Sequence, residues 1–110
     1  MRIKIGIDIV EIKRFEKFIE NKEFLEKVFH PSELKDSSLE HLAGIFAAKE
    51  AFFKALKVFP NWLAVEVINK KSGEPKINTN ISGIADIDLS ISHEKSYAIA
   101  NVVLVKKGDG

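Results

Sequence analysis

The segment Phe46–Lys54 sets three charged residues inside a stretch that otherwise has the composition of a buried helix. Lys49, Glu50 and Lys54 stand there among alanine and phenylalanine. Charges buried without partners are costly, so such a helix needs polar partners from elsewhere in the chain or from a ligand. Glu50 and Lys54 are also four residues apart, the spacing of an ordinary surface ion pair, and both explanations stay open at this point.

One acid interrupts an apolar strand predicted for residues 3–9. Isoleucines occupy alternate positions of this strand, whereas Gly6 and Asp8 share the opposite face. Gly6 leaves space beside Asp8 for a ligand or for another backbone, although an aspartate in a strand often simply faces water. Asp8 and Glu50 together would supply the carboxylates with which Mg²⁺ binds phosphates, and Lys54 could neutralise phosphate charge. The sequence therefore indicates a magnesium and phosphate site.

The composition restricts the class of protein. The chain of 110 residues fits one domain, which we place at residues 1–105 and which is followed by a polar tail, 106–110. Seventeen basic and sixteen acidic residues nearly balance, which argues against a nucleic-acid partner. The absence of cysteine excludes disulfides, thiolate metal sites and cysteine nucleophiles. The apolar runs are too short to cross a membrane, so we expect no membrane partner and a cytoplasmic location.

The order of the predicted elements gives the fold class. Apolar spacing predicts helices over about 10–20, 24–29, 31–33 and 39–57, with Ser37 or Ser38 capping the last. Strands follow at 63–69, 86–92 and 97–105, with a turn at 72–75. One strand, then helices, then several strands favours an α+β domain in which an antiparallel sheet packs against the long helix.

Two further polar features have both a plain and a functional explanation. His93 follows the predicted strand 86–92 at a hairpin turn, where it is either an ordinary turn residue or a contact for a phosphate or a base. Lys13, Arg14 and Lys17 form either a solvated helix face or a surface that docks an acidic protein helix.

Three ordered motifs together resemble the holo-acyl-carrier-protein synthases, the small type of 4′-phosphopantetheinyl transferase. These motifs are Gly6–Asp8 continuing to Arg14, Phe46–Ala51 with Lys54, and Ile91–His93. The resemblance covers nearly the whole chain. It implies transfer of the 4′-phosphopantetheine arm of coenzyme A to a serine of apo acyl carrier protein, with release of adenosine 3′,5′-bisphosphate. It also implies α+β subunits assembled as homotrimers, with active sites at subunit interfaces.

The resemblance assigns roles to individual residues. Asp8 and Glu50 match the family's Mg²⁺ ligands, and Lys54 matches its lysine near the pyrophosphate. We expect Glu50 to accept the serine proton, directly or through a metal-bound water, and Lys54 to stabilise or protonate the leaving phosphate. Glu50 and Lys54 are thus the predicted catalytic residues. The predicted binding residues are Lys49, Lys54 and His93 for coenzyme A and Lys13, Arg14 and Lys17 for the carrier protein.

The chain departs from the family pattern at both ends of the central motif. Ile45 stands where family members commonly have an arginine associated with coenzyme A phosphate binding. The family's Gly-Thr-Gly loop is replaced by Lys57–Asn61, which is shorter and has no glycine. We expect altered coenzyme A contacts, for which Lys57 or a lysine of a neighbouring subunit compensates.

These departures keep two alternatives open. One is a non-enzymatic carrier-protein or nucleotide-binding subunit that has lost efficient transfer. The other is an enzyme of the same chemistry that modifies carrier domains of a specialised pathway.

Overall fold

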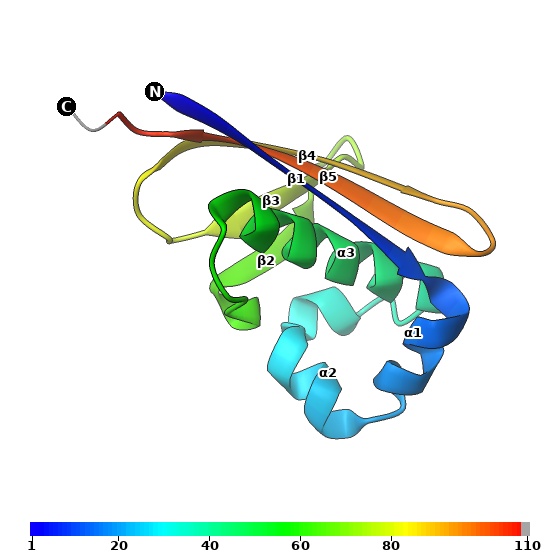
Figure 1. The fold of residues 1–110 in the computed structure, drawn as a ribbon. Helices are drawn as coiled ribbons and strands as arrows, with labels where there is room; N and C mark the ends of the chain where they lie inside the picture. Colours follow the sequence, from blue (N-terminus) through cyan, green and yellow to red (C-terminus); the bar gives the residue numbers. More distant parts are fainter. Residues whose placement is uncertain (109–110) are drawn as a thin grey trace.

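One long helix, α3 (Leu39–Leu56), crosses the face of a three-stranded antiparallel sheet (Figure 1). The computed structural model describes residues 1–108. The sheet has the strand order β1 (Arg2–Glu11), β5 (Tyr97–Lys106), β4 (Ile84–His93). The predicted α+β fold, with an antiparallel sheet packed against a long helix, is confirmed. Among the described residues, no helix combines the length and apolar character needed to cross a bilayer.

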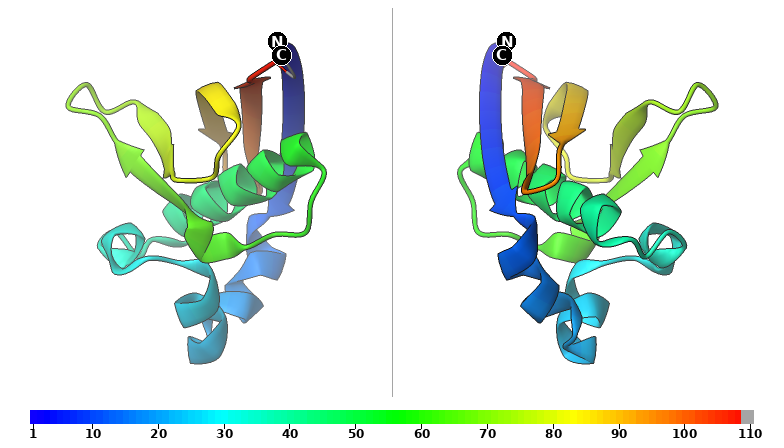
Figure 2. Two further views of the ribbon diagram at one scale, coloured as in Figure 1. Left: turned by 90° about the vertical axis from the view of Figure 1, so that its left-hand side faces the viewer. Right: turned by 90° about the vertical axis from the view of Figure 1, so that its right-hand side faces the viewer.

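A second, two-stranded sheet leans away from the first (Figure 2). Its strands are β2 (Val65–Asn69) and β3 (Pro75–Thr79), and a short 3₁₀-helix, Trp62–Ala64, leads into it. The sequence analysis placed only a turn before β3 and missed the strand itself. β3 buries Ile77 alone among its five residues, so its apolar alternation is too short to signal a strand.

Small helices cover the side of α3 that faces away from the sheet (Figures 1 and 2). They are α1 (Ile12–Ile19), α2 (Lys22–Val28) and the 3₁₀-helix Pro31–Leu34. The first helix begins two residues later than predicted, because Val10 and Glu11 still pair with β5. Aromatic rings fill the space between these helices and α3, notably Phe15 and Phe46 with centroids 5.3 Å apart.

Strand β1 has an unusual division between its two faces. Gly6, Asp8 and Val10 are buried toward α3, whereas the isoleucines on the other face are 60–72% exposed. A Cβ on Gly6 would lie 1.9 Å from the backbone oxygen of Ala51, so the backbone of α3 rests directly on this glycine. The sequence analysis expected either a ligand or another backbone beside Gly6, and in the structure the backbone of α3 lies there.

The last strand, β5, extends one residue further than predicted. Lys106 pairs with Arg2, and the Lys107 N–H donates to the Gly83 oxygen at 2.9 Å, so the sheet runs into the predicted polar tail. Residues 109–110 of that tail lie outside the described residues. Helix α3 ends at Leu56, one residue earlier than predicted.

Candidate active site

Asp8, Glu50 and Lys54 meet where β1 crosses α3. The Lys54 Nζ donates to Asp8 Oδ1 at 2.8 Å and to the Ile7 backbone oxygen at 3.2 Å. The Asp8 side chain is 9% exposed and that of Lys54 is 53% exposed, so the pair lies at the surface with the carboxylate innermost. Because Gly6 lets β1 and α3 touch through their backbones, both elements hold these side chains at a fixed separation.

Glu50 adds a second carboxylate beside Asp8. Burial raises the pKa of the Glu50 carboxyl, and the negative charge of Asp8 raises it further, while Lys54 acts in the opposite direction. The charge of Asp8 therefore disfavours the ionised form of Glu50. A bound cation would relieve this repulsion.

The donor set fits magnesium better than a transition metal. Within residues 1–108, no group of three or more His, Cys, Asp and Glu side chains could hold a metal ion. Mg²⁺ is commonly bound by one or two carboxylates, with waters and substrate phosphates completing the octahedron. Asp8 and Glu50 match that requirement.

A surface cavity of about 180 Å³ opens beside the two carboxylates. Arg14, on α1, lines it with Asp8 and Glu50, so the structure brings this predicted carrier-binding residue to the acids. Lys13 and Lys17 are exposed on the same short helix. The cavity is also lined by Phe18, an aromatic residue with 50% exposure that the sequence analysis missed. Its position one helical turn after Arg14 was the available signal.

His93 lies in a different cavity. This cavity, of about 470 Å³, is lined by His93 at the end of β4, by Ile45 and His41 on α3, and by Asn69. It contains neither Asp8 nor Glu50. The sequence analysis did not single out His41, although it precedes Ile45 by four residues and so shares its helix face.

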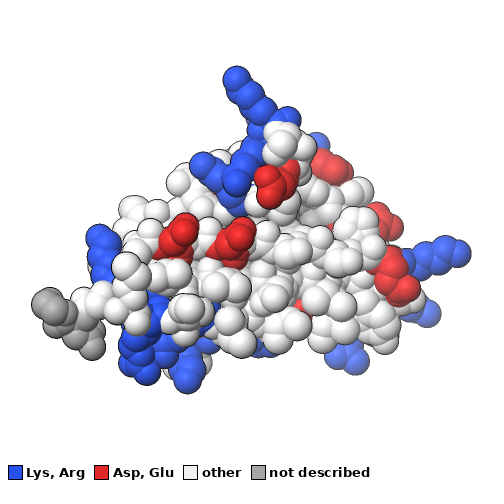
Figure 3. Space-filling model, turned by 90° about the horizontal axis from the view of Figure 1, so that it is seen from above, with Lys and Arg blue, Asp and Glu red and all other residues white. Residues whose placement is uncertain are grey.

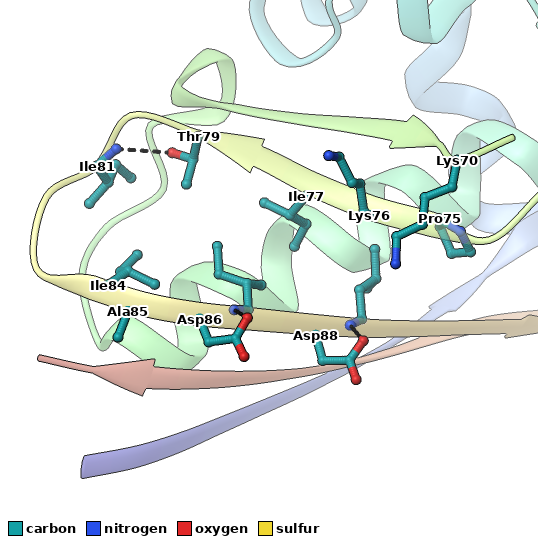
Figure 4. Close-up of a pocket in the computed structure, with 12 residues that line it drawn as sticks. Lys70, Pro75, Lys76, Ile77, Thr79, Ile81, Ile84, Ala85, Asp86 and Asp88 are labelled. Carbon is teal, nitrogen blue, oxygen red and sulfur yellow. Dashed lines mark hydrogen bonds between the residues drawn. The ribbon is translucent and has the colours of Figure 1, made fainter. Parts of the chain in front are cut away.

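A third cavity, of about 430 Å³, lies between β3 and β4 and holds none of the predicted site residues (Figure 4). The Asp86 and Asp88 side chains point away from β3, and each accepts a hydrogen bond from the backbone N–H of the next residue at 2.9 Å. Both carboxylates therefore already accept hydrogen bonds from the backbone of β4.

Lys49 does not join the site, which corrects its predicted contact with coenzyme A. Its side chain is fully buried, and its Nζ donates to Glu33 Oε1 at 2.7 Å, to the Val28 oxygen at 2.6 Å and to the Trp62 oxygen at 3.3 Å. Glu33 in turn accepts a hydrogen bond from the Val67 N–H at 2.7 Å. With three acceptors around it inside the core, the ammonium group has no access to a phosphate.

Comparison with known proteins identifies the family of the chain. A family model described as the 4′-phosphopantetheinyl transferase superfamily matches residues 4–102. The chain belongs to this superfamily. The resemblance inferred from the three motifs is thereby confirmed, and the match includes Asp8, Glu50, Lys54 and His93 in its span.

Individual members of the superfamily are similar over nearly their full length. Holo-[acyl-carrier-protein] synthase of Oceanobacillus iheyensis is 43% identical over 115 residues, covering 91% of this chain and 93% of that protein. The crystal structure of the Helicobacter pylori synthase in complex with coenzyme A is 36% identical in sequence and has a TM-score of 0.84. The match covers 92% of this chain and 99% of that one. The Bacillus anthracis synthase, in complex with CoA (3′,5′-ADP), is 40% identical with a TM-score of 0.80, covering 94% of this chain and 96% of that one.

Proposed function

We propose that this protein is a holo-acyl-carrier-protein synthase, which transfers 4′-phosphopantetheine from coenzyme A to a serine of apo acyl carrier protein. The observation that carries the proposal is the meeting of Asp8, Glu50 and Lys54 on two elements whose backbones touch. Membership of the superfamily and the printed activity of its similar members support the same reaction. Adenosine 3′,5′-bisphosphate is the second product.

The chemistry follows from the residue types. Asp8 and Glu50 would hold Mg²⁺, which when bound offsets the charge that builds on the pyrophosphate. Glu50 accepts the proton of the serine hydroxyl as its oxygen forms the new bond to phosphorus. Lys54 stays near the bridging oxygen and stabilises the bisphosphate as its bond to phosphorus breaks. Lys54 already donates to Asp8, so its ammonium lies within reach of an anion at the carboxylates.

The carrier protein is proposed to dock on α1. Lys13, Arg14 and Lys17 present positive charge there, and acyl carrier proteins offer an acidic helix according to the family resemblance. Phe18 adds an exposed apolar contact beside Arg14. This surface borders the cavity that contains Asp8 and Glu50, so a serine delivered there would approach the acids.

We also propose that the protein is a homotrimer with shared active sites. The exposed isoleucine face of β1 is the apolar surface that such an assembly would cover. His93 and Ile45 line one cavity, and Asp8 and Glu50 line another. We therefore propose that a coenzyme A molecule bound at His93 of one subunit has its pyrophosphate at Asp8 and Glu50 of a neighbouring subunit. A cytoplasmic location and a place in fatty acid biosynthesis belong to the same proposal.

A mass measurement tests the transfer. Purified protein, Mg²⁺ and coenzyme A are incubated with apo acyl carrier protein, and the carrier should gain the mass of one phosphopantetheine arm. Chelation of Mg²⁺ with EDTA should stop the gain. Glu50→Gln should abolish transfer with the fold intact, whereas Glu23→Gln, an exposed acid on α2, should leave it unchanged. Near-normal turnover of Glu50→Gln would refute the role of Glu50.

The same measurement separates the alternatives. No added mass on any of several apo carriers would favour a non-enzymatic binding subunit, which the substitution at Ile45 and the altered loop Lys57–Asn61 motivate. Transfer to carrier domains of a specialised pathway, and not to the fatty-acid carrier, would favour the second alternative.

A further inference from the structure

Lys49 and Glu33 are buried charges that the proposed transfer does not use. Most lysine, arginine, aspartate and glutamate side chains of the chain project from its surface, as on the face shown in Figure 3. Among residues 1–108, the charged residues that are buried are Asp8, Glu33 and Lys49. Asp8 belongs to the candidate site, whereas the Lys49 and Glu33 side chains are fully enclosed by the protein. Their place in the core therefore needs a separate explanation.

Stability alone is a poor explanation for a buried ion pair. The cost of taking two charges out of water opposes their attraction, and apolar side chains of similar volume often replace such a pair without loss of stability. The hydrogen bonds of a buried pair are directional, however, so they fix the relative position of the elements that carry them. The elements that Lys49 and Glu33 join therefore show what the pair could position.

Glu33 joins the 3₁₀-helix Pro31–Leu34 to the β2–β3 hairpin. Its Oε2 accepts a hydrogen bond from the Val67 N–H on β2 at 2.7 Å. Two more side-chain contacts join the same two segments, those of His30 with the Leu63 oxygen and of Ser32 with Glu66. The hairpin and the residues that lead into it are thus bonded to the segment that carries Glu33.

Lys49 joins that 3₁₀-helix to α3. Its Nζ donates to Glu33 Oε1 at 2.7 Å, and within residues 1–108 no other hydrogen bond connects the two helices. The Nζ also donates to the Trp62 oxygen at 3.3 Å, three residues before β2 begins. The hairpin forms a separate sheet that leans away from the three-stranded one (Figure 2). Its polar connection to α3 therefore runs through Lys49 and Glu33.

The hairpin is also one wall of the cavity that contains His93. Val67 of β2 lines this cavity together with His41 and Ile45 of α3. His41, Ile45 and Lys49 follow one another at intervals of four residues, so they share one face of the helix. The first two line the cavity, and the third bonds to the segment that holds its hairpin wall.

We propose that Lys49 and Glu33 are positioning residues for the cavity that contains His93. They hold the β2–β3 hairpin at a fixed distance from α3, and this distance sets the width of the cavity. The inference rests on the proposed function, in which coenzyme A contacts His93. A displacement of about 1 Å caused far from the chemistry can reduce activity about a hundredfold, so a wall held by directional bonds matters to a substrate bound there.

Steady-state kinetics of a charge-free pair test the inference. Lys49→Met combined with Glu33→Gln removes both buried charges and nearly keeps the side-chain volumes, so the double variant should fold, with a urea midpoint within about 1 M of wild type. Methionine cannot donate to the 3₁₀-helix, so the hairpin loses its polar connection to α3. KM for coenzyme A should rise about five- to twentyfold, with kcat within about threefold and KM for the carrier protein within about twofold of wild type.

Leu104→Ala controls for a general loss of stability. Leu104 is fully buried on β5 and lines neither the cavity of His93 nor that of Asp8 and Glu50. This variant should unfold at a lower urea concentration than wild type and keep its KM for coenzyme A within about twofold. An equal rise of that KM in both variants, or a KM within twofold of wild type in the double variant, would overturn the inference.

Amide hydrogen exchange gives a readout that needs no transfer. In the double variant, exchange of the amides that pair β2 with β3 should accelerate at least about tenfold more than exchange of the amides that pair β1 with β5. Uniform acceleration in both sheets, or none in the hairpin, would show that the pair does not hold the hairpin.

Glu33→Gln alone serves if the double variant does not fold. An amide nitrogen then replaces one carboxylate oxygen, so the side chain loses its bond either to Lys49 or to the Val67 N–H. The same rise in KM for coenzyme A and the same local acceleration of exchange are expected, and their absence would count against the inference equally.

The two proposals can fail independently. Wild-type protein that transfers no phosphopantetheine would refute the enzyme, while calorimetric binding of coenzyme A that is five- to twentyfold weaker in the double variant would keep the positioning role. Wild-type protein that transfers phosphopantetheine, with an unaltered KM in the double variant, would keep the enzyme and refute the positioning role.

Discussion

The negative charge that Glu50 needs for the proposed metal binding lowers the stability of the folded protein when no metal is bound. Its pKa is raised by burial and then by Asp8, so its ionised form is disfavoured in the folded protein. This penalty is absent below the ordinary carboxyl pKa and grows as the pH rises through the raised pKa. With a chelator present, Glu50→Gln should therefore raise the thermal midpoint at pH 7.5, by about 2 to 5 °C.

The pH dependence provides the control for this prediction. Near pH 4 wild-type Glu50 is protonated, so the difference between the two proteins should vanish. Scanning calorimetry at both pH values, in EDTA and at equal protein concentration, measures the difference in thermal midpoint between the two proteins. An equal gain at both pH values would show that the effect does not come from the charge of Glu50.

Lys49 and Glu33 form a pair whose disruption should be costly. Both side chains are fully buried, and Glu33 also accepts from backbone N–H groups of His30 and Val67 at 2.7 Å. Lys49→Met leaves the Glu33 carboxylate buried without its cation, so we expect a loss of about 3 to 5 kcal/mol in the free energy of unfolding.

Urea denaturation monitored by Trp62 fluorescence, at matched protein concentration, measures this loss. The same substitution at the exposed Lys71 should change the free energy of unfolding by less than about 0.5 kcal/mol. A loss below 1 kcal/mol at Lys49 would mean that the carboxylate finds another partner.

Residue patterns singled out Asp8 and Glu50, which the fold brings together, but could not distinguish the two lysines. Lys49 and Lys54 both lie in the same apolar segment, and each needed a partner. The partner of Lys49 is Glu33, which lies 16 residues earlier in the chain in the short 3₁₀-helix Pro31–Leu34. Such a contact between distant segments follows from three-dimensional packing, so no local spacing predicts it.

At the scale of elements, the contact of β1 with α3 through Gly6 fixes the site. An added Cβ would lie 1.9 Å from Ala51 O and 2.8 Å from Ala55 N, and these backbone atoms cannot move without shifting the helix. Gly6→Ala should therefore lower the free energy of unfolding by at least about 2 kcal/mol. It should also weaken Mg²⁺ binding, because Asp8 and Glu50 would move apart.

Gly44→Ala is the matched control. Its Cβ would meet the flexible Ile91 Cγ2 at 3.1 Å, and alanine favours the helix, so a change within about 1 kcal/mol is expected. Urea denaturation and Mg²⁺ titration of both variants test the prediction. Equal effects of the two substitutions would contradict a special role for the Gly6 contact.

Periodicity predicted most elements because long helices and long strands carry strong signals. The alternating isoleucines of β1 indicated a shared face, but they could not reveal that this face is exposed in the single chain. Which face of a strand is covered depends on its neighbours, and apolar residues can be covered by another subunit as well as by a core. The strand β3 was missed because a short half-buried hairpin arm has little alternation.

At the scale of the whole molecule, the exposed isoleucine face predicts association. We expect a light-scattering mass of about 37 kDa, three times the 12.4 kDa of one chain. Ile5 is 72% exposed within this face, and Ile5→Glu should reduce the mass to that of a monomer and abolish transfer. A charge change at an exposed position elsewhere, Lys71→Glu, should keep the trimer mass. A wild-type monomer that transfers phosphopantetheine would contradict the shared-site proposal.

The placement of His93 also belongs to this scale. The ordered motifs pointed to His93, Asp8 and Glu50 together, yet in one chain they line separate cavities. A motif records the residues that a site needs, and it carries no information on which subunit supplies each one. The sequence could therefore propose members of the candidate site but could not predict how the fold arranges them.

The alternation of β1 has a consequence for how this sequence can vary. Even-numbered residues of the strand, from Gly6 to Val10, face α3 and carry the acid of the site, while odd-numbered isoleucines face outward. Inserting or deleting one residue before Gly6 shifts only the residues ahead of it, and Gly6, Asp8 and Val10 keep their places on the buried face. The same change between Gly6 and Asp8 would exchange the two faces, presenting an isoleucine to α3 and turning the aspartate outward. Length variation in this strand should therefore be confined to its first few residues.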